Sequence, residues 1–282
     1  MKRKFDRLIT VFLALTLMAG VALLAYPSVS DYWNSFHQTK AVTSYGALVE
    51  QIDAAEREKI RESARLYNED LVEREYPWVL SDEQREEYES QLAMDSTGIM
   101  GYVEIPSLRC TLPVYHGTEE SVLQTAIGHI EGSSLPVGGP STHSVLSGHR
   151  GLPTAKLFTD LDKLSEGDTF MLRVLDETLT YEVDQIRIVE PHEVQDLEIV
   201  EGEDYCTLVT CTPYGINTHR LLVRGYRVET VNDASLHVNA DALLVDPDIV
   251  SACIAIPVLL VLFAGAMVWP RKKGDGQNAL RN

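Results

Sequence analysis

The chain has 282 residues and a formal charge of 24 − 42 = −18 at pH 7. Nucleic-acid binding needs Lys and Arg contacts to phosphate, so this charge argues against a nucleic-acid partner. Once two apolar segments are set aside, the remaining length suits one compact domain with a helical extension.

The first apolar segment is an uncharged run at residues 8–25, which is long enough to cross a bilayer as a helix. The preceding end, residues 1–7, is basic. Because basic residues stay on the cytoplasmic side of a membrane, we expect residues 8–26 to be a transmembrane helix or signal anchor that leads the chain outward. A cleaved secretory signal is the alternative.

The second apolar segment is an uncharged run at residues 249–269, and three basic residues follow it: Arg271, Lys272 and Lys273. We expect a second transmembrane helix here, with residues 231–248 as a stalk and residues 270–282 as a basic cytoplasmic tail. Both termini then lie in the cytoplasm, and the residues between the two spans lie outside the cell.

The segment at residues 27–96 has the composition of a helical extension. Residues 44–74 lack Pro, are rich in Ala, Glu, Leu and Arg, and predict one or two helices. After a polar interruption, Ser81 and Asp82 can cap a further short helix that ends near Leu92.

Between residues 97 and 230 the pattern changes to short runs rich in Val, Ile, Leu, Thr and Tyr. Gly, Pro, Asn or Asp separates most of these runs, which is typical of β-strands. A series of short strands without regular helices between them indicates a closed barrel or a sandwich. We expect a mainly β fold. Residues 152–164 could hold a short helix, and residues 176–178 a hairpin connection.

The four cysteines are Cys110, Cys206, Cys211 and Cys253, and their spacings match no common zinc pattern. No metal or cofactor site is therefore expected. Cys253 lies in the second apolar run. Cys110 and Cys206 could form a disulfide, but buried free thiols are the favoured state.

Cys211 ends a β-rich run, and Pro213 and Gly215 then force a loop. Arg220 starts the returning strand, so it can lie beside Cys211, where a cation favours the thiolate form of the sulfur. Cys206 is five residues earlier than Cys211. By strict alternation it faces the other side of the strand, as a packing residue.

A histidine is the usual partner of a catalytic thiol, and the chain has eight histidines. His149 has Gly148 before it and Gly151 shortly after it, and these glycines leave the ring accessible. His116 and His129 have the surroundings of structural histidines in turns. His149 is therefore a candidate partner of Cys211, although Gly-His-Arg-Gly is also a sequence typical of an ordinary turn.

Three motifs together resemble those of the sortase family. Residues 207–211 (TLVTC) resemble the family's TLxTC motif, residues 217–225 (NTHRLLVRG) resemble the strand that carries its arginine, and residues 147–151 (SGHRG) resemble its histidine loop. The likeness extends over roughly residues 97–230. It implies a cysteine transpeptidase with a sortase-type closed β-barrel of about eight strands and three catalytic residues: His149, Cys211 and Arg220.

Within that family the chain resembles class C, the pilin-polymerising group, which typically has an N-terminal helical extension and a second membrane segment. Its members often carry a lid loop with an Asp-Pro-aromatic sequence that enters the active site. The nearest counterpart here is Tyr76-Pro77-Trp78, in which Tyr replaces Asp. The resemblance implies a lid, whereas a latch between an acid and the thiol is not expected. Ordinary packing of Trp78 against the barrel is the alternative.

The resemblance further implies a substrate protein with an LPxTG-like sorting signal. The Cys211 thiolate would attack the carbonyl between Thr and Gly and form a thioester, and His149 would protonate the leaving amine. Arg220 would stabilise the oxyanion or orient the substrate. A pilin lysine would then resolve the thioester.

Three alternatives stay open at this point. A sortase of another class would use an amine of a lipid II or peptidoglycan cross-bridge as acceptor. A membrane-tethered scaffold would have no catalytic activity. A metal-site protein would take its ligands from four histidines, although no paired-carboxylate or CxxC spacing supports it: His116, His129, His143 and His149.

Overall fold

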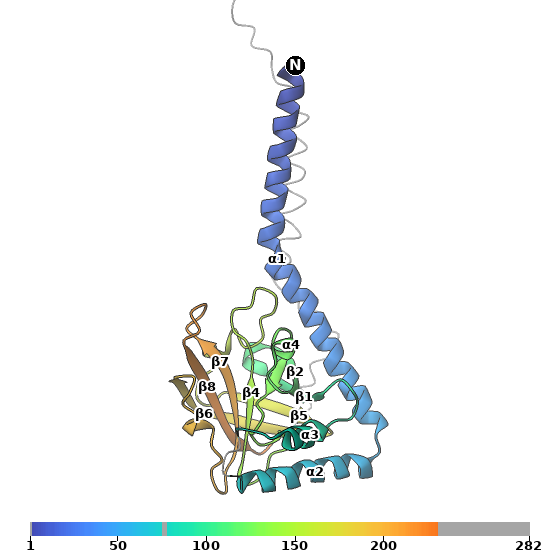
Figure 1. Cartoon of the computed structure of the whole chain (residues 1–282), viewed down its shortest axis with the longest axis vertical. Coiled ribbons are helices and arrows are strands. Elements are labelled where there is room, and N and C mark those ends of the chain that lie inside the picture. Colours follow the sequence, from blue (N-terminus) through green and yellow to red (C-terminus); the bar gives the residue numbers. More distant parts are fainter. Residues whose placement is uncertain (1, 75–77, 231–282) are drawn as a thin grey trace, which may run out of the picture. The chain divides into compact units, whose positions relative to one another are not determined.

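Eight β-strands close into a barrel in the computed structural model, which describes residues 2–74 and 78–230 (Figure 1). The order around the barrel is β1-β2-β3-β4-β7-β8-β6-β5. The pairs β2–β3 and β4–β7 are parallel, and the other neighbouring pairs are antiparallel. The strands are β1 (Ile99–Ile105), β2 (Cys110–His116), β3 (Ile127–His129), β4 (Thr142–Ser147), β5 (Thr169–Val174), β6 (Glu177–Val189), β7 (Asp204–Thr212) and β8 (His219–Val228).

The interior of the barrel holds the main hydrophobic core. Alternation along β6 turns Leu179, Tyr181 and Val183 inward, where the Tyr181 ring stacks on Phe170 with 5.6 Å between the ring centroids. Side chains of the same kind come from the other strands and from the segment that follows β4: Val103, Ile105, Leu112, Val114, Leu146, Phe158, Leu172, Leu208 and Val223. The closed barrel expected from the sequence is thus confirmed.

Two local predictions differ from the structure. β3 was not expected, because a strand of three residues is too short to show alternation in the sequence. The helix expected at residues 152–164 is wrong, since only the 3₁₀ turn η2 (Leu161–Lys163) forms there. Pro153 lies near the start of this segment. The next residue bonds helix α1, because Asn34 Nδ2 donates to the Thr154 carbonyl at 2.8 Å.

Four short turns connect the strands. They are η1 (Pro106–Leu108), α4 (Glu120–Leu123), η2 and η3 (Gln195–Leu197). The hairpin between β5 and β6 turns at Leu175 and Asp176, and Leu175 has the left-handed φ of 53°.

Helix α1 (Lys2–Gln51) contains the apolar segment near the N-terminus. Within the described part of the chain, it is the one helix long and apolar enough to cross a membrane. Large apolar side chains of this segment are exposed, among them Leu8, Phe12, Leu23 and Leu24. Residues up to Val29 belong to one unit, and the unit that begins at Ser30 contains the barrel. The predicted stalk, second span and tail lie outside the described residues.

The C-terminal part of α1 is fixed to the barrel by Tyr45. Its hydroxyl donates to the Met100 carbonyl at 2.9 Å and accepts from the Leu175 amide at 2.8 Å. Burial raises the pKa of Tyr45 above its ordinary value. One side chain therefore bonds the backbones of both β1 and the β5–β6 turn, and this fixes the position of the C-terminal part of α1 against the barrel.

Helices α2 (Ala54–Val72) and α3 (Asp82–Ser90) complete the extension, and Figure 1 shows them at one end of the barrel. Asp53 caps α2 by accepting from the Glu56 amide at 2.8 Å. Ser81 caps α3, as the sequence predicted, and it forms a capping box with Gln84, which was not predicted.

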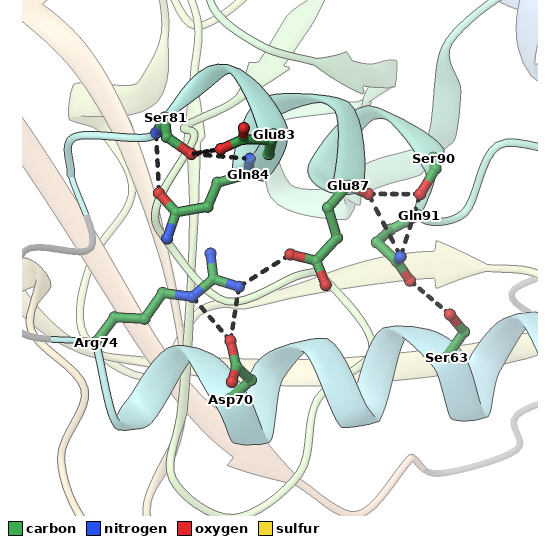
Figure 2. Close-up of polar contacts among 9 residues, drawn as sticks. All are labelled: Ser63, Asp70, Arg74, Ser81, Glu83, Gln84, Glu87, Ser90 and Gln91. Carbon is green, nitrogen blue, oxygen red and sulfur yellow. Dashed lines mark hydrogen bonds and ion pairs between the residues drawn. The ribbon is translucent and has the colours of Figure 1, made fainter.

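Polar contacts join α2, which precedes residues 75–77, to α3, which follows them (Figure 2). Arg74 Nη2 lies 2.7 Å from Asp70 of α2 and 3.2 Å from Glu87 of α3. Ser63 Oγ donates to Gln91 Oε1 at 2.8 Å. The two helices therefore pack as one layer.

A buried arginine and an apolar cluster attach this layer to the barrel. The Arg61 side chain is 9% exposed and forms ion pairs with Glu58, Asp176 and Glu177. The cluster joins helix, loop and strand residues: Ala64, Tyr67, Tyr88, Leu92, Met100, Leu135, Val137, Val174 and Leu175.

Candidate active site

The β7–β8 ladder places Cys211 directly opposite Arg220. Residues opposite each other in an antiparallel pair point to the same face of the sheet, with their Cβ atoms about 5 Å apart. Both side chains are partly exposed. A guanidinium at this position can stabilise a thiolate, or an oxyanion that forms next to the sulfur.

The loop between β7 and β8 turns tightly just after the cysteine. The Ile216 and Asn217 amides both donate to the Pro213 carbonyl, at 3.1 and 3.0 Å. Gly215 has φ 74° and Asn217 has φ 60°, which are left-handed conformations that these two residue types adopt at low cost. The turn therefore returns the chain in the register that pairs Arg220 with Cys211.

His149 lies in the turn that follows β4, the parallel neighbour of β7. The Gly148 amide donates to the Val209 carbonyl at 3.0 Å, and Thr210 Oγ1 donates to the Gly148 carbonyl at 2.7 Å. Arg150 Nη1 donates to Thr212 Oγ1 at 3.3 Å. The residues on both sides of His149 thus bond the residues on both sides of Cys211. The His149 side chain is 28% exposed, which leaves it open to a substrate.

Two further contacts define the electrostatics of the site. Nε2 of His149 lies 3.7 Å from Oε2 of Glu120, a residue of α4 whose side chain is 72% exposed. Arg220 Nη1 donates to the carbonyls of His219 at 3.2 Å and Asn217 at 3.4 Å. The site therefore holds one thiol, one imidazole and one guanidinium, with a carboxylate beside the imidazole.

Trp78 packs on the face of the sheet that carries Cys211. Its neighbours form a cluster of β-strand and loop residues: Val145, Val189, Leu197, Val209 and Leu222. Val209 is two residues before Cys211 and Leu222 is two residues after Arg220, so both point to the same face as the candidate site. Tyr76 and Pro77, the other two residues of the predicted lid, lie outside the described residues.

Cys206 and Cys110 are free thiols in packing positions. Cys206 is fully buried in the barrel core, on the face opposite to Cys211, which confirms the prediction from alternation. Burial raises the pKa of the Cys206 thiol well above its ordinary value, and raises that of Cys110 to about 12. Neither thiol is in a state suited to nucleophilic attack.

Three other histidines of the barrel strands are engaged in structural contacts. His129 is buried, with Nδ1 3.0 Å from the Tyr88 hydroxyl and Nε2 2.9 Å from the Ser134 carbonyl. His143 bonds Thr207 Oγ1 at 2.7 Å and the Glu198 carbonyl at 2.9 Å. Burial lowers the pKa of each to about 4. His116 lies between the Gln91 and Gly98 carbonyls.

Two residues at the site were not singled out from the sequence. Glu120 contacts His149 from a helical turn far back in the chain, and no motif marks it. Arg150 lies inside the motif that drew attention to His149, but its bond to Thr212 depends on the β4–β7 pairing. Among residues 2–74 and 78–230, no group of three or more His, Cys, Asp or Glu side chains could hold a metal ion.

Comparison with known proteins identifies the family. Residues 103–228 match the family model of the sortase domain. Sortase C1 from Streptococcus agalactiae is 55% identical with a TM-score of 0.66, and the match covers 68% of this chain and 100% of that one. Sortase C from Streptococcus pneumoniae is 45% identical with a TM-score of 0.61, covering 68% and 97%.

A third solved structure is sortase C from Clostridium perfringens with the C-terminal cell wall sorting motif. It is 42% identical with a TM-score of 0.60, covering 68% of this chain and 99% of that one. Matches of this extent to several sortase C chains, over a barrel with a cysteine and an arginine paired across two strands, lead to one conclusion: the chain belongs to the sortase family of cysteine transpeptidases, and class C sortases are among its structural neighbours.

Proposed function

We propose that this chain is a membrane-anchored pilin-polymerising sortase. It cleaves an LPxTG-like sorting signal between Thr and Gly and joins the acyl group to a lysine of a pilin. The proposal is supported by similarity to sortase C of S. pneumoniae, whose structure was described in terms of pilin substrate specificity, and of C. perfringens, whose structure includes a sorting motif. The observation that carries it is the cross-strand pair of Cys211 and Arg220 beside the His149 turn.

The first half of the reaction forms a thioester at Cys211. The thiolate sulfur attacks the carbonyl carbon of the Thr–Gly bond, and the carbonyl oxygen takes up the negative charge. Arg220, opposite Cys211, donates hydrogen bonds to that oxygen or orients the peptide. As the C–N bond breaks, the His149 imidazolium gives its proton to the departing amine. General acid catalysis of this kind contributes about 10²- to 10⁴-fold.

The second half transfers the acyl group to an amine. The now neutral His149 accepts a proton from the attacking lysine amine, the C–S bond breaks, and an isopeptide bond replaces the thioester. Water can take the place of the amine and releases the free acid. An amine of a lipid II or peptidoglycan cross-bridge would instead give an anchoring sortase, so the acceptor distinguishes the two functions.

Trp78 and its two neighbours Tyr76 and Pro77 are the proposed lid. Trp78 packs against an apolar cluster on the face of the sheet that carries Cys211. This cluster includes Val209, which lies two residues before Cys211 on β7. Arg74 and Ser81 anchor the chain on either side of the lid, through contacts to Asp70, Glu87 and Gln84 (Figure 2).

A labelled LPxTG-type peptide tests the proposal. Incubation with the full chain should give a thioester adduct on Cys211 by mass spectrometry. The Cys211→Ala variant should give no adduct, whereas Cys206→Ala should still give it, because Cys206 lies in the core. Equal loss in both variants would refute the assignment of the nucleophile. Addition of a pilin with its lysine, or of a cross-bridge peptide, then shows which amine resolves the adduct.

The rate of acylation should fall at both low and high pH. Catalysis requires a thiolate at Cys211 and an imidazolium at His149 in the same molecule, so acid removes the first and base removes the second. Measurement of kcat/KM against pH with the peptide checks this. A profile that stays flat to high pH would exclude His149 as the acid.

A further inference from the structure

The β-ladder between β4 and β7 ends before it reaches the two reacting side chains. The last paired residues are Ser147 and Val209. His149 and Cys211 each lie two residues beyond that pair, so no ladder hydrogen bond sets the distance between imidazole and sulfur. Contacts outside the ladder have to set it.

On the N-terminal side of His149, Gly148 is held to β7 by its amide and its carbonyl. On the C-terminal side the connection to β7 is made by a side chain, because Arg150 Nη1 donates to Thr212 Oγ1 at 3.3 Å. Thr212 is the residue directly after Cys211. This contact therefore joins the residue after the histidine to the residue after the nucleophile.

The Arg150 guanidinium is itself held by three segments of the chain. Its side chain is 10% exposed and forms an ion pair with Asp162 of η2. Its Cζ lies 6.0 Å from the centroid of the Tyr214 ring in the β7–β8 loop. That ring also covers the next residue, since a Cβ at Gly151 would come within 2.9 Å of it. The guanidinium thus links the histidine turn, η2 and the loop after Cys211.

The Nε atom of Arg150 is buried and has no hydrogen-bond partner. A buried donor without an acceptor is unfavourable for folding. Arg57 and Arg74 of the helical extension have a guanidinium nitrogen in the same state, so the case for Arg150 rests on its contact with Thr212.

We propose that Arg150 is a positioning residue, whose bond to Thr212 holds the imidazole of His149 beside the sulfur of Cys211. The inference rests on the proposed function, because it assumes that these two groups react together. An error of about 1 Å in such a geometry can lower a rate by about 10²-fold. Loss of the contact should also change how readily the sulfur reacts with an alkylating reagent, because the position of the imidazole beside it changes.

The test uses the full chain and two readouts: acylation by an LPxTG-type peptide in a single turnover, and alkylation of Cys211 by iodoacetamide as a function of pH. Arg150→Gln and Thr212→Val should each lower the acylation rate by about 10- to 100-fold and shift the alkylation profile. The double variant should be no slower than the slower single variant, because both substitutions remove the same contact. Arg150→Lys, which keeps the charge, should recover part of the rate.

Arg173→Gln is the matched control. Arg173 also bonds a threonine hydroxyl and a carboxylate, with Thr178 at 2.9 Å and Glu104 at 3.1 Å, but it does so on β5 and β1, away from the histidine turn. It should keep the wild-type rate and alkylation profile.

An unchanged alkylation profile in both Arg150→Gln and Thr212→Val would overturn the inference, as would an equal effect of Arg173→Gln. Thr212→Val removes only a hydroxyl group, so it gives a decisive result even if Arg150→Gln does not fold. Failure of the proposed function would look different: the wild-type chain would form no acyl adduct, while the alkylation profiles would still report on the contact.

Discussion

Arg220 is the cation that β-strand pairing places opposite Cys211, the proposed nucleophile, and its role can be separated from that of a general positive charge. We predict that Arg220→Ala lowers kcat for peptide cleavage by about 10²- to 10³-fold, because one donor to the oxyanion is lost. Arg187→Ala should have no such effect, since the Arg187 guanidinium forms an exposed ion pair with Asp196. Steady-state cleavage of a labelled peptide measures both, and a loss below threefold in Arg220→Ala would contradict the assignment.

His129 gives the fold a defined sensitivity to acid. Burial lowers its pKa from 6.5 to about 4. Between these values the unfolded chain binds the proton and the folded chain does not, so the free energy of unfolding decreases as the pH falls through that window. The full effect is about 3 kcal/mol. Denaturant unfolding of the full chain in detergent should show this slope.

The variant His129→Gln tests this origin of the slope. It should be less stable at pH 7, because the bonds to Tyr88 and Ser134 are altered, but its stability should depend less on pH between 6.5 and 4. The exposed His192 supplies the control, and His192→Gln should keep the wild-type slope. If His129→Gln has the wild-type slope as well, other groups cause the acid sensitivity.

Single residues differed in how far the sequence could predict them. Cys211 and Arg220 were predictable because a strand, a Pro-Gly loop and a returning strand bring them together locally. His149 was predictable as a candidate from its glycines, but its approach to Cys211 depends on the parallel β4–β7 pairing. Glu120 carries no local signal, since its contact with His149 exists only after the whole barrel has closed.

At the scale of elements, α2 depends on one arginine more than on its neighbour. The Arg61 side chain is 9% exposed and contacts Glu58, Asp176 and Glu177, whereas the Arg65 side chain is 43% exposed with ion-pair distances of 3.7 to 3.9 Å. We predict that Arg61→Ala lowers the free energy of unfolding by about 2 kcal/mol, less than a fully buried pair because the partner carboxylates are half exposed. Arg65→Ala should cost less than about 1 kcal/mol.

Denaturant titration of the two variants gives the comparison, and Arg61→Ala should also make α2 more open to limited proteolysis. Equal losses of stability in the two variants would show that burial of Arg61 does not matter. A double-mutant cycle with Asp176→Asn would then measure how much of the Arg61 effect passes through the β5–β6 turn.

Elements with strong local signals were predicted correctly, and those set by tertiary contacts were not. The start of α3 follows from Ser81 and Gln84, which bond each other within one turn. The segment at residues 152–164 has a composition that permits a helix, but Asn34 of α1 bonds the Thr154 carbonyl, which is then not available for a helical hydrogen bond. β3 forms because β2 and β4 offer free edges on both of its sides, a condition that no local pattern records.

At the scale of the whole molecule, the site depends on barrel closure. Cys211 follows His149 by 211 − 149 = 62 residues and precedes Arg220 by 220 − 211 = 9. Strand pairing of β4 with β7 and of β7 with β8 turns these separations into neighbouring positions at one end of the barrel. The mainly β class could be inferred from the short apolar runs of the sequence, whereas the number and order of the strands needed either the structure or the family resemblance.

The last prediction concerns the topology of the chain in the membrane. Basic residues precede the apolar segment of α1 and follow the apolar run at residues 249–269, so both ends should stay in the cytoplasm and the barrel should lie outside.

A membrane-impermeant maleimide applied to intact cells should label a Glu166→Cys variant, because Glu166 is exposed on the barrel. It should label an Asn278→Cys variant only after lysis. Both variants carry Cys110→Ala and Cys211→Ala as background, which removes the two partly exposed thiols of the described residues. Labelling of Asn278→Cys before lysis would mean that the second apolar run does not cross the membrane, and failure to label Glu166→Cys would place the barrel on the wrong side for a sorting signal that leaves the cell.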